Sequence, residues 1–509
     1  MTDTELFDIF KSLKDSAPGY DEMKLSPLKS ALEYFVYPLS YVCNLSMQQG
    51  VFPQELKTAN VVPLYKKDDS MVFSNYRPVS LLTSLSKVFE KVMYNRLISF
   101  LNKYKILYKY QFGFRKDHST YLALMCLMDK LIKCLENGEH VVGVFLDFSK
   151  AFDTVDHDIL MTKLYHYGIR DNALNWFKSY LSNREQFVTY NESKSSMKKI
   201  KCGVPQGSIL GPVLFLLYIN DLSTLCDKVF SIFFADDSNL FKSDKNLSVI
   251  EEVLNSELEQ ISMWLKANKL YMNVSKTQYM IFSGRRDVEL SFDLHIEGNK
   301  LNCVDKSKFL GVIIDNKLTW KDHVSYIAMK VSKGIGIVVK ARHFLSQKSL
   351  LSLYYSFVYP HISYCNHIWG NAAATYINRL TVLQKRVIRI ITGVPPRTPS
   401  APLYAKLKVL NLIQMNKFLI GQLMFKYHHN KLPDVISNLF TPNREIHAHN
   451  TRQRNCLHPP KVKTELSKRS VDYRGVILWN QIISTNVSLN VSHLTFKNHL
   501  RKIILEEEI

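Results

Sequence analysis

The sequence predicts an α+β fold of several structural units, and three observations lead to this expectation. The chain has 509 residues, which at about 150 residues per domain corresponds to about three units. Hydrophobic residues make up 46% and charged residues 22%, a composition typical of folded proteins rather than of disordered or fibrous ones. Apolar runs with the character of strands alternate with helical patterns as far as about residue 320, and beyond it the pattern becomes helical.

Charge and apolar runs exclude several classes of protein. Lys and Arg outnumber Asp and Glu by 66 to 45, a net charge of +21 that attracts either nucleic acid or an anionic lipid surface. The longest apolar candidate, residues 212–219, is far shorter than the roughly 20 residues of a membrane span, and the acidic N-terminus does not fit a signal peptide. The 8 cysteines include no C-x-x-C pair, which argues against a zinc knuckle and favours reduced thiols. We therefore expect an intracellular protein that is not inserted in a membrane.

The first strand with functional interest ends in an aspartate. Up to about residue 110 the chain mixes helices and short strands, and residues 84–97 have the apolar spacing of a helix. Residues 141–146 form a near-continuous apolar strand, and Asp147 follows at its C-terminal end. A helix comes next, and Gly168 stops it.

The second such strand leads into a pair of aspartates. Residues 229–234 are apolar, Asp236 and Asp237 follow in a tight turn, and the chain resumes as a strand, which places both acids at a hairpin tip. A helix that we expect to pack across the back of the sheet comes next, opened by a capping box of Ser248 and Glu251. The apolar face that we expect it to bury consists of Ile250, Leu254, Leu258, Ile261 and Leu265.

The later part of the chain is helical and basic. Residues 377–391 predict an amphipathic helix whose polar face carries Arg379, Lys385, Arg386 and Arg389. A solvated surface would produce the same pattern. From about residue 443 the chain is rich in His, Lys and Arg around the aromatic anchors Tyr473 and Trp479, which we interpret as a small separate unit.

The three aspartates are the candidate catalytic residues. Buried carboxylates are costly unless a cation accompanies them, and strands as apolar as these should be neighbours in one sheet, which gathers Asp147, Asp236 and Asp237 at one edge. Mg²⁺ prefers hard oxygen ligands, and a pair of such ions supports an in-line phosphoryl displacement. The alternative for a single aspartate after a strand is a turn former or a helix cap.

Several motifs then occur in one order. Residues 146–157 read LDFSKAFDTVDH and residues 234–237 read FADD, with GVPQGS at 203–208 between them and NYRPVSLL at 75–82 upstream. Downstream stand NVSKT at 273–277 and FLG at 309–311. In these motifs the sequence resembles the reverse transcriptases of non-LTR retrotransposons, in particular the jockey type. The likeness is strong from about residue 18 to 315 and weaker beyond.

The resemblance implies roles for individual residues. Asp147 and Asp236 would be the essential metal ligands, helped by the Phe148 carbonyl, with Asp237 as the second acid of the pair. Two Mg²⁺ ions are implied, and Mn²⁺ would substitute for them. Lys66 and Arg77 would hold the incoming triphosphate; taken alone, both fit solvated surface charges.

Further implied roles concern the nucleotide site. Phe152 would be a steric gate that excludes a ribose 2′-hydroxyl, unless it is an ordinary core residue. Gln206 and Gly207 would pass close to the nascent base pair, where the alternative is a plain Pro-Gln-Gly turn. Lys276 would protonate the pyrophosphate leaving group, and a salt-bridged surface lysine is the alternative. The basic helix would track the template–primer backbone as a thumb does.

The resemblance also implies an architecture, a right-hand polymerase of α+β class with fingers, a palm with an antiparallel sheet, a helical thumb and a small basic C-terminal unit. We expect an N-terminal helical extension with the first finger motif at 1–45, fingers and palm at 46–315, the thumb at 316–430 and the basic C-terminal segment at 431–509. Relatives usually carry an endonuclease ahead of the polymerase, and here the earliest motif, at residues 17–21, begins almost at once, so we expect no such domain.

The implied function is target-primed reverse transcription: an RNA template, a DNA primer and deoxynucleoside triphosphates would be the partners, in the nucleus or cytoplasm. RNA as template comes from the likeness alone, because a positive surface suits DNA equally. A catalytically silent RNA-binding relic or recruited copy that kept the fold is the first alternative. A structural interaction module, whose nucleic-acid binding would be weak and insensitive to salt, is the second.

Overall fold

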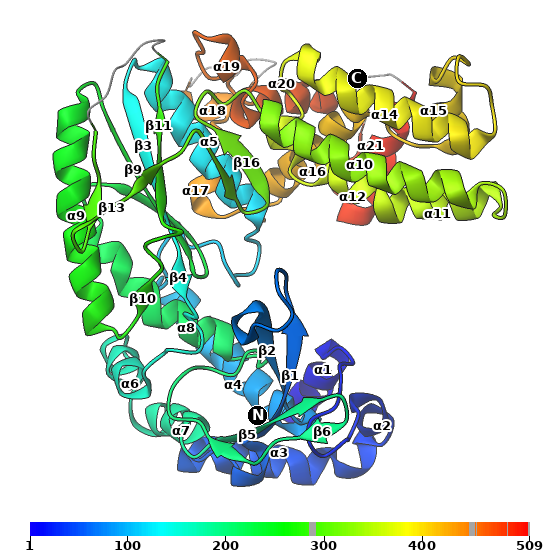
Figure 1. Cartoon of the computed structure of the whole chain (residues 1–509). Helices are drawn as coiled ribbons and strands as arrows, with labels where there is room; N and C mark the ends of the chain where they lie inside the picture. The colour runs from blue at the N-terminus through cyan, green and yellow to red at the C-terminus, as the bar shows by residue number, and fades with distance from the viewer. Residues whose placement is uncertain (285–291, 447–453, 455, 486, 507–509) are drawn as a thin grey trace.

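The computed structural model describes residues 1–284, 292–446, 454, 456–485 and 487–506. Its ribbon is a C-shaped arch (Figure 1). N-terminal helices and a first sheet form the lower arm, a central sheet forms the back, and a layer of helices forms the upper arm. This is the predicted α+β class.

The lower arm combines helices with a small sheet. Strands β1 and β2 are antiparallel, β5 lies parallel to β1 on its other side, and the shorter β6 and β7 pair with β5. The strands are β1 (Thr58–Tyr65), β2 (Tyr76–Leu81), β5 (Glu185–Tyr190), β6 (Ser193–Lys194) and β7 (Lys198–Lys199). The helices of this arm and of the lower back are α1 (Asp3–Ser12), α2 (Leu25–Ser30), α3 (Leu32–Gln49), α4 (Ser84–Lys103), α6 (His157–His166), α7 (Asp171–Leu181) and α8 (Gly211–Ile219).

The central sheet has the strand order β14-β11-β3-β9-β8 and is antiparallel except for the β11–β14 pair. Its strands are β3 (His140–Leu146), β8 (Phe230–Phe234), β9 (Asp237–Asp244), β11 (Gln278–Phe282) and β14 (Asn302–Cys303). Helix α5 (Thr120–Glu136) packs on β3 and β8, and α9 (Leu247–Ala267) packs on β9 (Figure 1).

Alternation along β3 explains why both helix layers are needed. Val141 and Phe145 belong to the core that includes α5, whereas Val142, Val144 and Leu146 belong to the core that includes α8 and α9. Successive side chains of a strand point to opposite faces, so a strand that is apolar at nearly every position must be covered on both sides. The predicted apolar face of α9 is confirmed, because all five of its residues are at most 3% exposed.

The start of α9 differs from the prediction. Its N-cap is Asn246, whose side chain accepts the backbone N–H of Ser248, so the capping box of Ser248 and Glu251 was wrong. Glu251 instead accepts the N–H of Asp293 at 3.1 Å. Asn and Ser are both good N-cap residues, and the sequence alone does not separate two candidates two positions apart.

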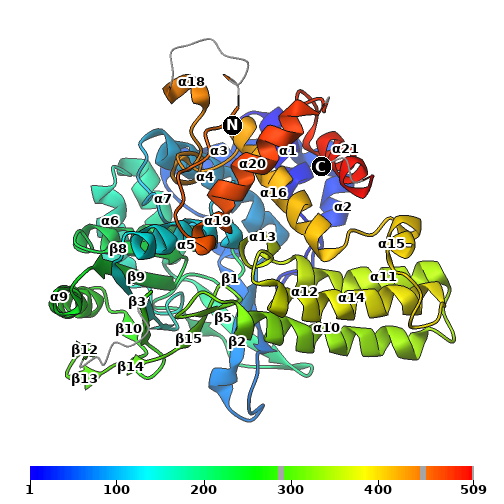
Figure 2. The ribbon, with the colours of Figure 1, turned by 90° about the horizontal axis from the view of Figure 1, so that it is seen from above.

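The upper arm is helical. Figure 2 shows α10, α11 and α14 side by side in one layer, and α10 contacts both of the others. The helices are α10 (Lys321–Ala341), α11 (Gln347–Phe357), α12 (Tyr359–Ser363), α13 (Asn366–Trp369), α14 (Ala374–Thr392), α15 (Ala401–Leu407), α16 (Leu412–His428), α17 (Asp434–Ser437), α18 (Asn443–Ile446), α19 (Glu465–Lys468), α20 (Val471–Ser484) and α21 (His493–Leu505). Short strand pairs complete the fold: β4 (Phe148–Ser149) with β10 (Tyr271–Met272), β12 (His295–Ile296) with β13 (Asn299–Lys300), and β15 (Lys306–Phe309) with β16 (Val312–Asp315).

The C-terminal segment shares its core with the helices before it. Helices α20 and α21 both pack on α16, where a Cβ added to Gly421 would lie 2.7 Å from a methyl carbon of Leu500. Their apolar residues belong to the same cluster as those of α5 and α10. The expected separate unit therefore has no separate core. No helix in the described part of the chain is long and apolar enough to cross a membrane.

Candidate active site

Asp147 follows the last residue of β3 and is held by the segment that precedes β11. Its backbone N–H donates to the Thr277 hydroxyl at 3.3 Å, and its carbonyl accepts the N–H of Asn273 at 2.7 Å. Immediately after it, Phe148 pairs with Met272 in the short β4–β10 ladder. The predicted position at a strand end is confirmed, and the backbone around it is fixed on both sides.

Asp236 lies in the two-residue turn between β8 and β9, and Asp237 is the first residue of β9, so both acids lie at the tip of the hairpin as predicted. Phe234 pairs with Asp237, and Ala235 between them adopts a left-handed conformation with φ of 56°. In the β3–β9 ladder the last paired residues are Leu146 and Ser238. Asp147 and Asp237 are the next residues outward on neighbouring strands, which lie about 5 Å apart. The three aspartates are thus gathered at one edge of the central sheet.

The carboxylates of this edge repel one another. Removal from water, together with the charges of Asp236 and Asp147, raises the pKa of Asp237 to about 6, and the charge of Lys66 opposes the shift. The pKa of Asp236 is also raised, first by burial and then by Asp147, against the charges of Arg77 and Lys66. Crowded anions of this kind favour a bound cation.

The acids nevertheless do not form a closed metal-ligand cluster. Within the described ranges, no group of three or more His, Cys, Asp or Glu side chains is arranged to hold a metal ion. The Lys276 ammonium lies 3.9 Å from one Asp147 carboxylate oxygen, and both side chains are substantially exposed. The donor set itself fits Mg²⁺, because carboxylate oxygens are the hard ligands this ion takes alongside water and substrate phosphates.

Lys66 and Arg77 stand on the β1–β2 hairpin. Arg77 pairs with Leu64 in the ladder, and the Lys66 N–H donates to the Asn75 carbonyl at 2.9 Å just beyond its end. Both side chains are exposed, and their charges act on the pKa of Asp236. The fold therefore brings this pair, which precedes the acids by at least 70 residues, toward the aspartate edge.

The predicted nucleotide loop is anchored at three points. The Gln206 carbonyl accepts the N–H of Ser80 at 2.7 Å, and its side-chain amide donates to Asp153 at 2.8 Å. Gly207 has φ of 126°, and a Cβ added there would lie 2.6 Å from the Ser80 carbonyl oxygen. Only glycine tolerates this combination of conformation and close approach.

Phe152 lies against the same loop. Its carbonyl accepts the N–H of Val204 at 2.9 Å, and its ring stacks on Phe215 of α8 with centroids 4.2 Å apart. The ring is half-buried, with one side supported by α8. This support limits how far the ring can move.

Gln111 is a residue that the sequence analysis missed. It is 2% exposed, and its side-chain oxygen accepts the N–H of Gly113 at 2.8 Å and that of Ala235 at 3.0 Å. A Cβ on Gly113 would lie 2.3 Å from the Ala235 nitrogen, so this segment presses directly on the aspartate turn. A glutamine two residues before a glycine is the only sequence signal, and it is weak.

The basic residues of α14 lie apart from this edge. Arg379 and Arg386 are exposed, and Lys385 is partly exposed. Arg379 donates to Ser325 at 3.4 Å on α10, while the Arg389 guanidinium donates to the Thr398 carbonyl at 2.7 Å. The structure does not join them to the aspartates; they form part of the upper arm.

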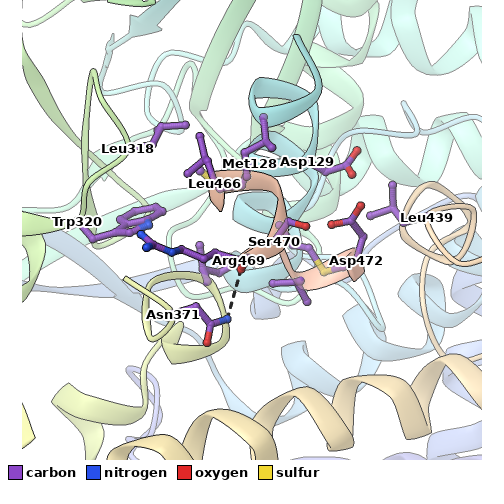
Figure 3. A pocket seen from close by; sticks show the side chains of 14 residues that line it. Met128, Asp129, Leu318, Trp320, Asn371, Leu439, Leu466, Arg469, Ser470 and Asp472 are labelled. Carbon is purple, nitrogen blue, oxygen red and sulfur yellow. Dashed lines mark hydrogen bonds between the residues drawn. The ribbon is translucent and has the colours of Figure 1, made fainter. Parts of the chain in front are cut away.

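A pocket between α5 and the C-terminal helices is separate from the aspartate edge of the central sheet. Figure 3 shows Asp129 of α5 opposite Asp472 of α20, and the Asn371 side chain donates to the Arg469 carbonyl at 3.3 Å. Trp320 also lines this pocket. None of the predicted site residues lines it.

Comparisons with known proteins agree with the sequence motifs. Residues 65–314 match the family described as reverse transcriptase (RNA-dependent DNA polymerase). The probable RNA-directed DNA polymerase from transposon BS of Drosophila melanogaster is 31% identical over 77% of this chain and 44% of its own length. The RNA-directed DNA polymerase from mobile element jockey of the same species is 29% identical over 74% and 42%. The chain therefore spans less than half the length of these relatives.

Solved structures are more distant. Apo telomerase from Candida tropicalis aligns with 76% of this chain and 67% of its own, with 12% identity and a TM-score of 0.40. That level of likeness supports no inference about this chain. The resemblance to polymerases of jockey and other non-LTR elements is confirmed by the sequence relatives. The predicted α+β class with an antiparallel sheet is confirmed by the structure.

Proposed function

Because residues 65–314 belong to the reverse transcriptase family, we propose that this chain is an RNA-directed DNA polymerase of a non-LTR retrotransposon. It adds deoxynucleotides to a DNA 3′-hydroxyl on an RNA template, in target-primed reverse transcription. The observation that carries the proposal is the meeting of Asp147, Asp236 and Asp237 at one sheet edge, opposite the Lys66 and Arg77 charges.

Asp147 and Asp236, with the Phe148 carbonyl and Asp237, would hold two Mg²⁺ ions, which supply activation of the 3′-hydroxyl and stabilisation of the leaving oxygen. Mn²⁺ would substitute. Burial, together with the charges of neighbouring aspartates, raises the pKa of Asp236 and Asp237, and this supports the assignment because a bound cation stabilises their ionised forms. The 3′-hydroxyl loses its proton to solvent, its oxygen attacks the α-phosphorus, the bond from that phosphorus to the bridging oxygen breaks, and pyrophosphate departs.

The remaining residues bind and orient the substrate. Lys66 and Arg77 neutralise the triphosphate, where a guanidinium fork and an ammonium are both effective. Lys276, which is close to Asp147, donates a proton to the departing pyrophosphate. Phe152 occupies the space that a ribose 2′-hydroxyl would need, and Gln206 with Gly207 lies along the nascent base pair. Cations of the upper arm, including α14, neutralise template–primer phosphates.

A primer-extension assay on an RNA template tests the proposal. We expect Mg²⁺-dependent extension by the wild-type chain, and loss of at least about 1,000-fold in Asp236→Asn and Asp147→Asn, since electrostatic stabilisation is the largest catalytic term. Asp244→Asn, at the far end of β9, is the matched control and should keep activity. Binding of RNA without extension by the wild-type chain would support the silent alternative, and extension unaffected by Asp236→Asn would contradict the proposed mechanism.

A further inference from the structure

Glu90 of α4 is the most completely buried acid near the nucleotide loop, and its contacts are specific. The side chain is 0% exposed, and one carboxylate oxygen accepts the backbone N–H groups of Ile209 at 2.6 Å and Leu210 at 3.2 Å. The other oxygen accepts the Ser86 hydroxyl at 3.2 Å. Ile209 and Leu210 connect the nucleotide loop to the first residue of α8.

The N–H groups at this point need an acceptor. The first N–H groups of a helix, and those of the turn leading into it, have no partner within the helix. Here the turn is closed by its own bonds, since Ser208 donates to the Pro205 carbonyl and its hydroxyl accepts the N–H of Gly211. These bonds leave Ile209 and Leu210 without a local acceptor, and Glu90 supplies one from a helix more than 100 residues earlier.

Burying the Glu90 carboxylate costs free energy, which argues that this side chain has a specific role. Burial raises the pKa of Glu90, and the charge of Arg184 with the two backbone donors opposes the shift. Arg184 is itself only 1% exposed, and two of its guanidinium nitrogens have no hydrogen-bond partner among the described residues. An uncompensated buried charge is strongly destabilising. The buried charges of Glu90 and Arg184 therefore stabilise each other.

The loop that Glu90 holds is the one that defines the proposed nucleotide site. Gln206 and Gly207 lie three and two positions before Ile209 and are pressed against Ser80 of β2. A shift of the 209–210 backbone would be transmitted through the tight turn to both residues. Glu90 therefore joins three elements, namely α4, the nucleotide loop and the start of α8.

We propose that Glu90 is a positioning residue that fixes the nucleotide-binding loop at residues 205–210 by accepting the backbone N–H groups of Ile209 and Leu210. The inference deepens the proposed function and rests on it for the kinetic consequence, because loop placement sets affinity for the incoming deoxynucleotide. The hydrogen-bonding part concerns the protein alone and is measurable without any reaction.

Two variants and a matched control test the proposal. Glu90→Gln keeps an oxygen that accepts both N–H groups, whereas Glu90→Ala removes it. The control is Glu257→Ala on α9, because Glu257 is also a buried glutamate, 2% exposed, and has no bond to the loop. If Glu90→Ala alone does not yield folded protein, the double variant Glu90→Ala with Arg184→Met is used in its place, because it also removes the unpaired charge of Arg184.

Amide hydrogen exchange is the first readout. We expect the amides of Ile209 and Leu210 to exchange at least about tenfold faster in Glu90→Ala than in the wild-type chain, with little change in Glu90→Gln or Glu257→Ala. Unchanged exchange at both amides in Glu90→Ala would overturn the proposal. This result does not depend on catalysis, so it separates the proposal from a failure of the proposed function, which would appear as an inactive wild-type chain.

Steady-state extension is the second readout. We expect Glu90→Ala to raise KM for the deoxynucleotide by about tenfold or more with a smaller change in kcat, and Glu90→Gln to stay within about threefold of the wild-type chain. An equal rise in Glu257→Ala would reduce the effect to general destabilisation and overturn the proposal. An equal loss in Glu90→Gln would assign the effect to pairing with Arg184 and overturn it as well.

Discussion

The side-chain oxygen of Gln111 accepts the backbone N–H of Ala235 at 3.0 Å, so a loop residue holds the turn that carries Asp236. Ala235 has a positive φ, a conformation that costs energy for any residue other than glycine. The same oxygen accepts the N–H of Gly113, whose missing side chain allows the two segments to meet. The position of Asp236 is therefore set from outside its own hairpin.

Replacing Gln111 by Leu should lower both the stability of the fold and kcat. The variant leaves two buried N–H groups without an acceptor, each costing about 1–3 kcal/mol, and it frees the aspartate turn to move. We expect a loss of at least about 2 kcal/mol in the free energy of unfolding and a fall in kcat of about 100-fold, since misplacement by 1 Å has an effect of that order.

The control for this prediction is Gln384→Leu in the upper arm. Gln384 is 1% exposed, and its amide donates to the Leu410 carbonyl and the Tyr354 hydroxyl, both at 3.0 Å. It should lose similar stability, measured by denaturant unfolding, and keep most of its kcat. Equal kcat losses in the two variants would show that Gln111 has no special effect on the aspartates.

The sequence placed the acids correctly because local patterns decide their position. Asp147 and Asp236 each end an apolar run, and the end of such a run fixes where the side chain emerges from the sheet. Gln111 gives no such pattern, and its partner Ala235 is 124 residues away. The C-terminal core depends on similarly distant contacts, such as Gly421 with Leu500, which periodicity within either helix does not reveal.

The raised pKa of Asp237 predicts a pH-dependent effect of Asp237→Asn on stability. Below the ordinary value of 3.8 the carboxyl is protonated in both the folded and the unfolded chain, so the substitution changes little. Between 3.8 and about 6 mainly the unfolded chain ionises, and above about 6 the folded chain carries an ionised carboxylate against its partial burial and the charges of Asp236 and Asp147. The variant should therefore gain thermal stability over the wild-type chain as the pH rises through this window.

Thermal melts at pH 4, 5, 6, 7 and 8 measure the difference in Tm between Asp237→Asn and the wild-type chain. The difference in Tm should grow up to about pH 6 and then level off, and Mg²⁺ at pH 7.5 should narrow it by stabilising the wild-type chain more, because a ligand of the folded state raises Tm. A difference in Tm that is constant across pH would contradict the raised pKa of Asp237 in the folded chain.

Lys66 and Arg77 should affect nucleotide affinity more than turnover. Each makes charge-assisted contacts to the triphosphate in the proposed site, and a hydrogen bond to a charged group contributes about 1.5–3 kcal/mol. We expect Lys66→Ala and Arg77→Ala each to raise KM for deoxynucleotides by about 10–100-fold in primer extension. Lys67→Ala is the matched control, because Lys67 is the next residue, is exposed, and pairs with Asp68 at 3.6 Å; an equal effect there would argue against a specific role.

Phe152 should set the preference for deoxyribose. Its ring is backed by Phe215, so shortening it to Val opens space without an easy collapse from behind. We expect Phe152→Val to reduce discrimination against ribonucleotides by at least about tenfold, measured as the ratio of kcat/KM for the two sugars. Phe114→Val, a change in an exposed ring whose centroid is 6.1 Å from that of Phe152, should leave the ratio within about threefold. Unchanged discrimination against ribonucleotides in Phe152→Val would indicate that Phe152 is an ordinary core residue and not a steric gate.

The exposed cations of α14 should contribute to nucleic-acid affinity through phosphates, and salt dependence measures this directly. Each phosphate neutralised on a duplex adds about 0.9 to the slope of log K against log salt concentration. We expect Arg379→Gln combined with Arg386→Gln to reduce the slope by about 1–2, whereas Lys11→Gln combined with Lys14→Gln, the same loss of charge near α1, should not. Arg389 differs, because its guanidinium is bound to the Thr398 carbonyl, so Arg389→Gln should lower Tm rather than the slope. An unchanged slope in the first double variant would leave α14 as a solvated face of the upper arm.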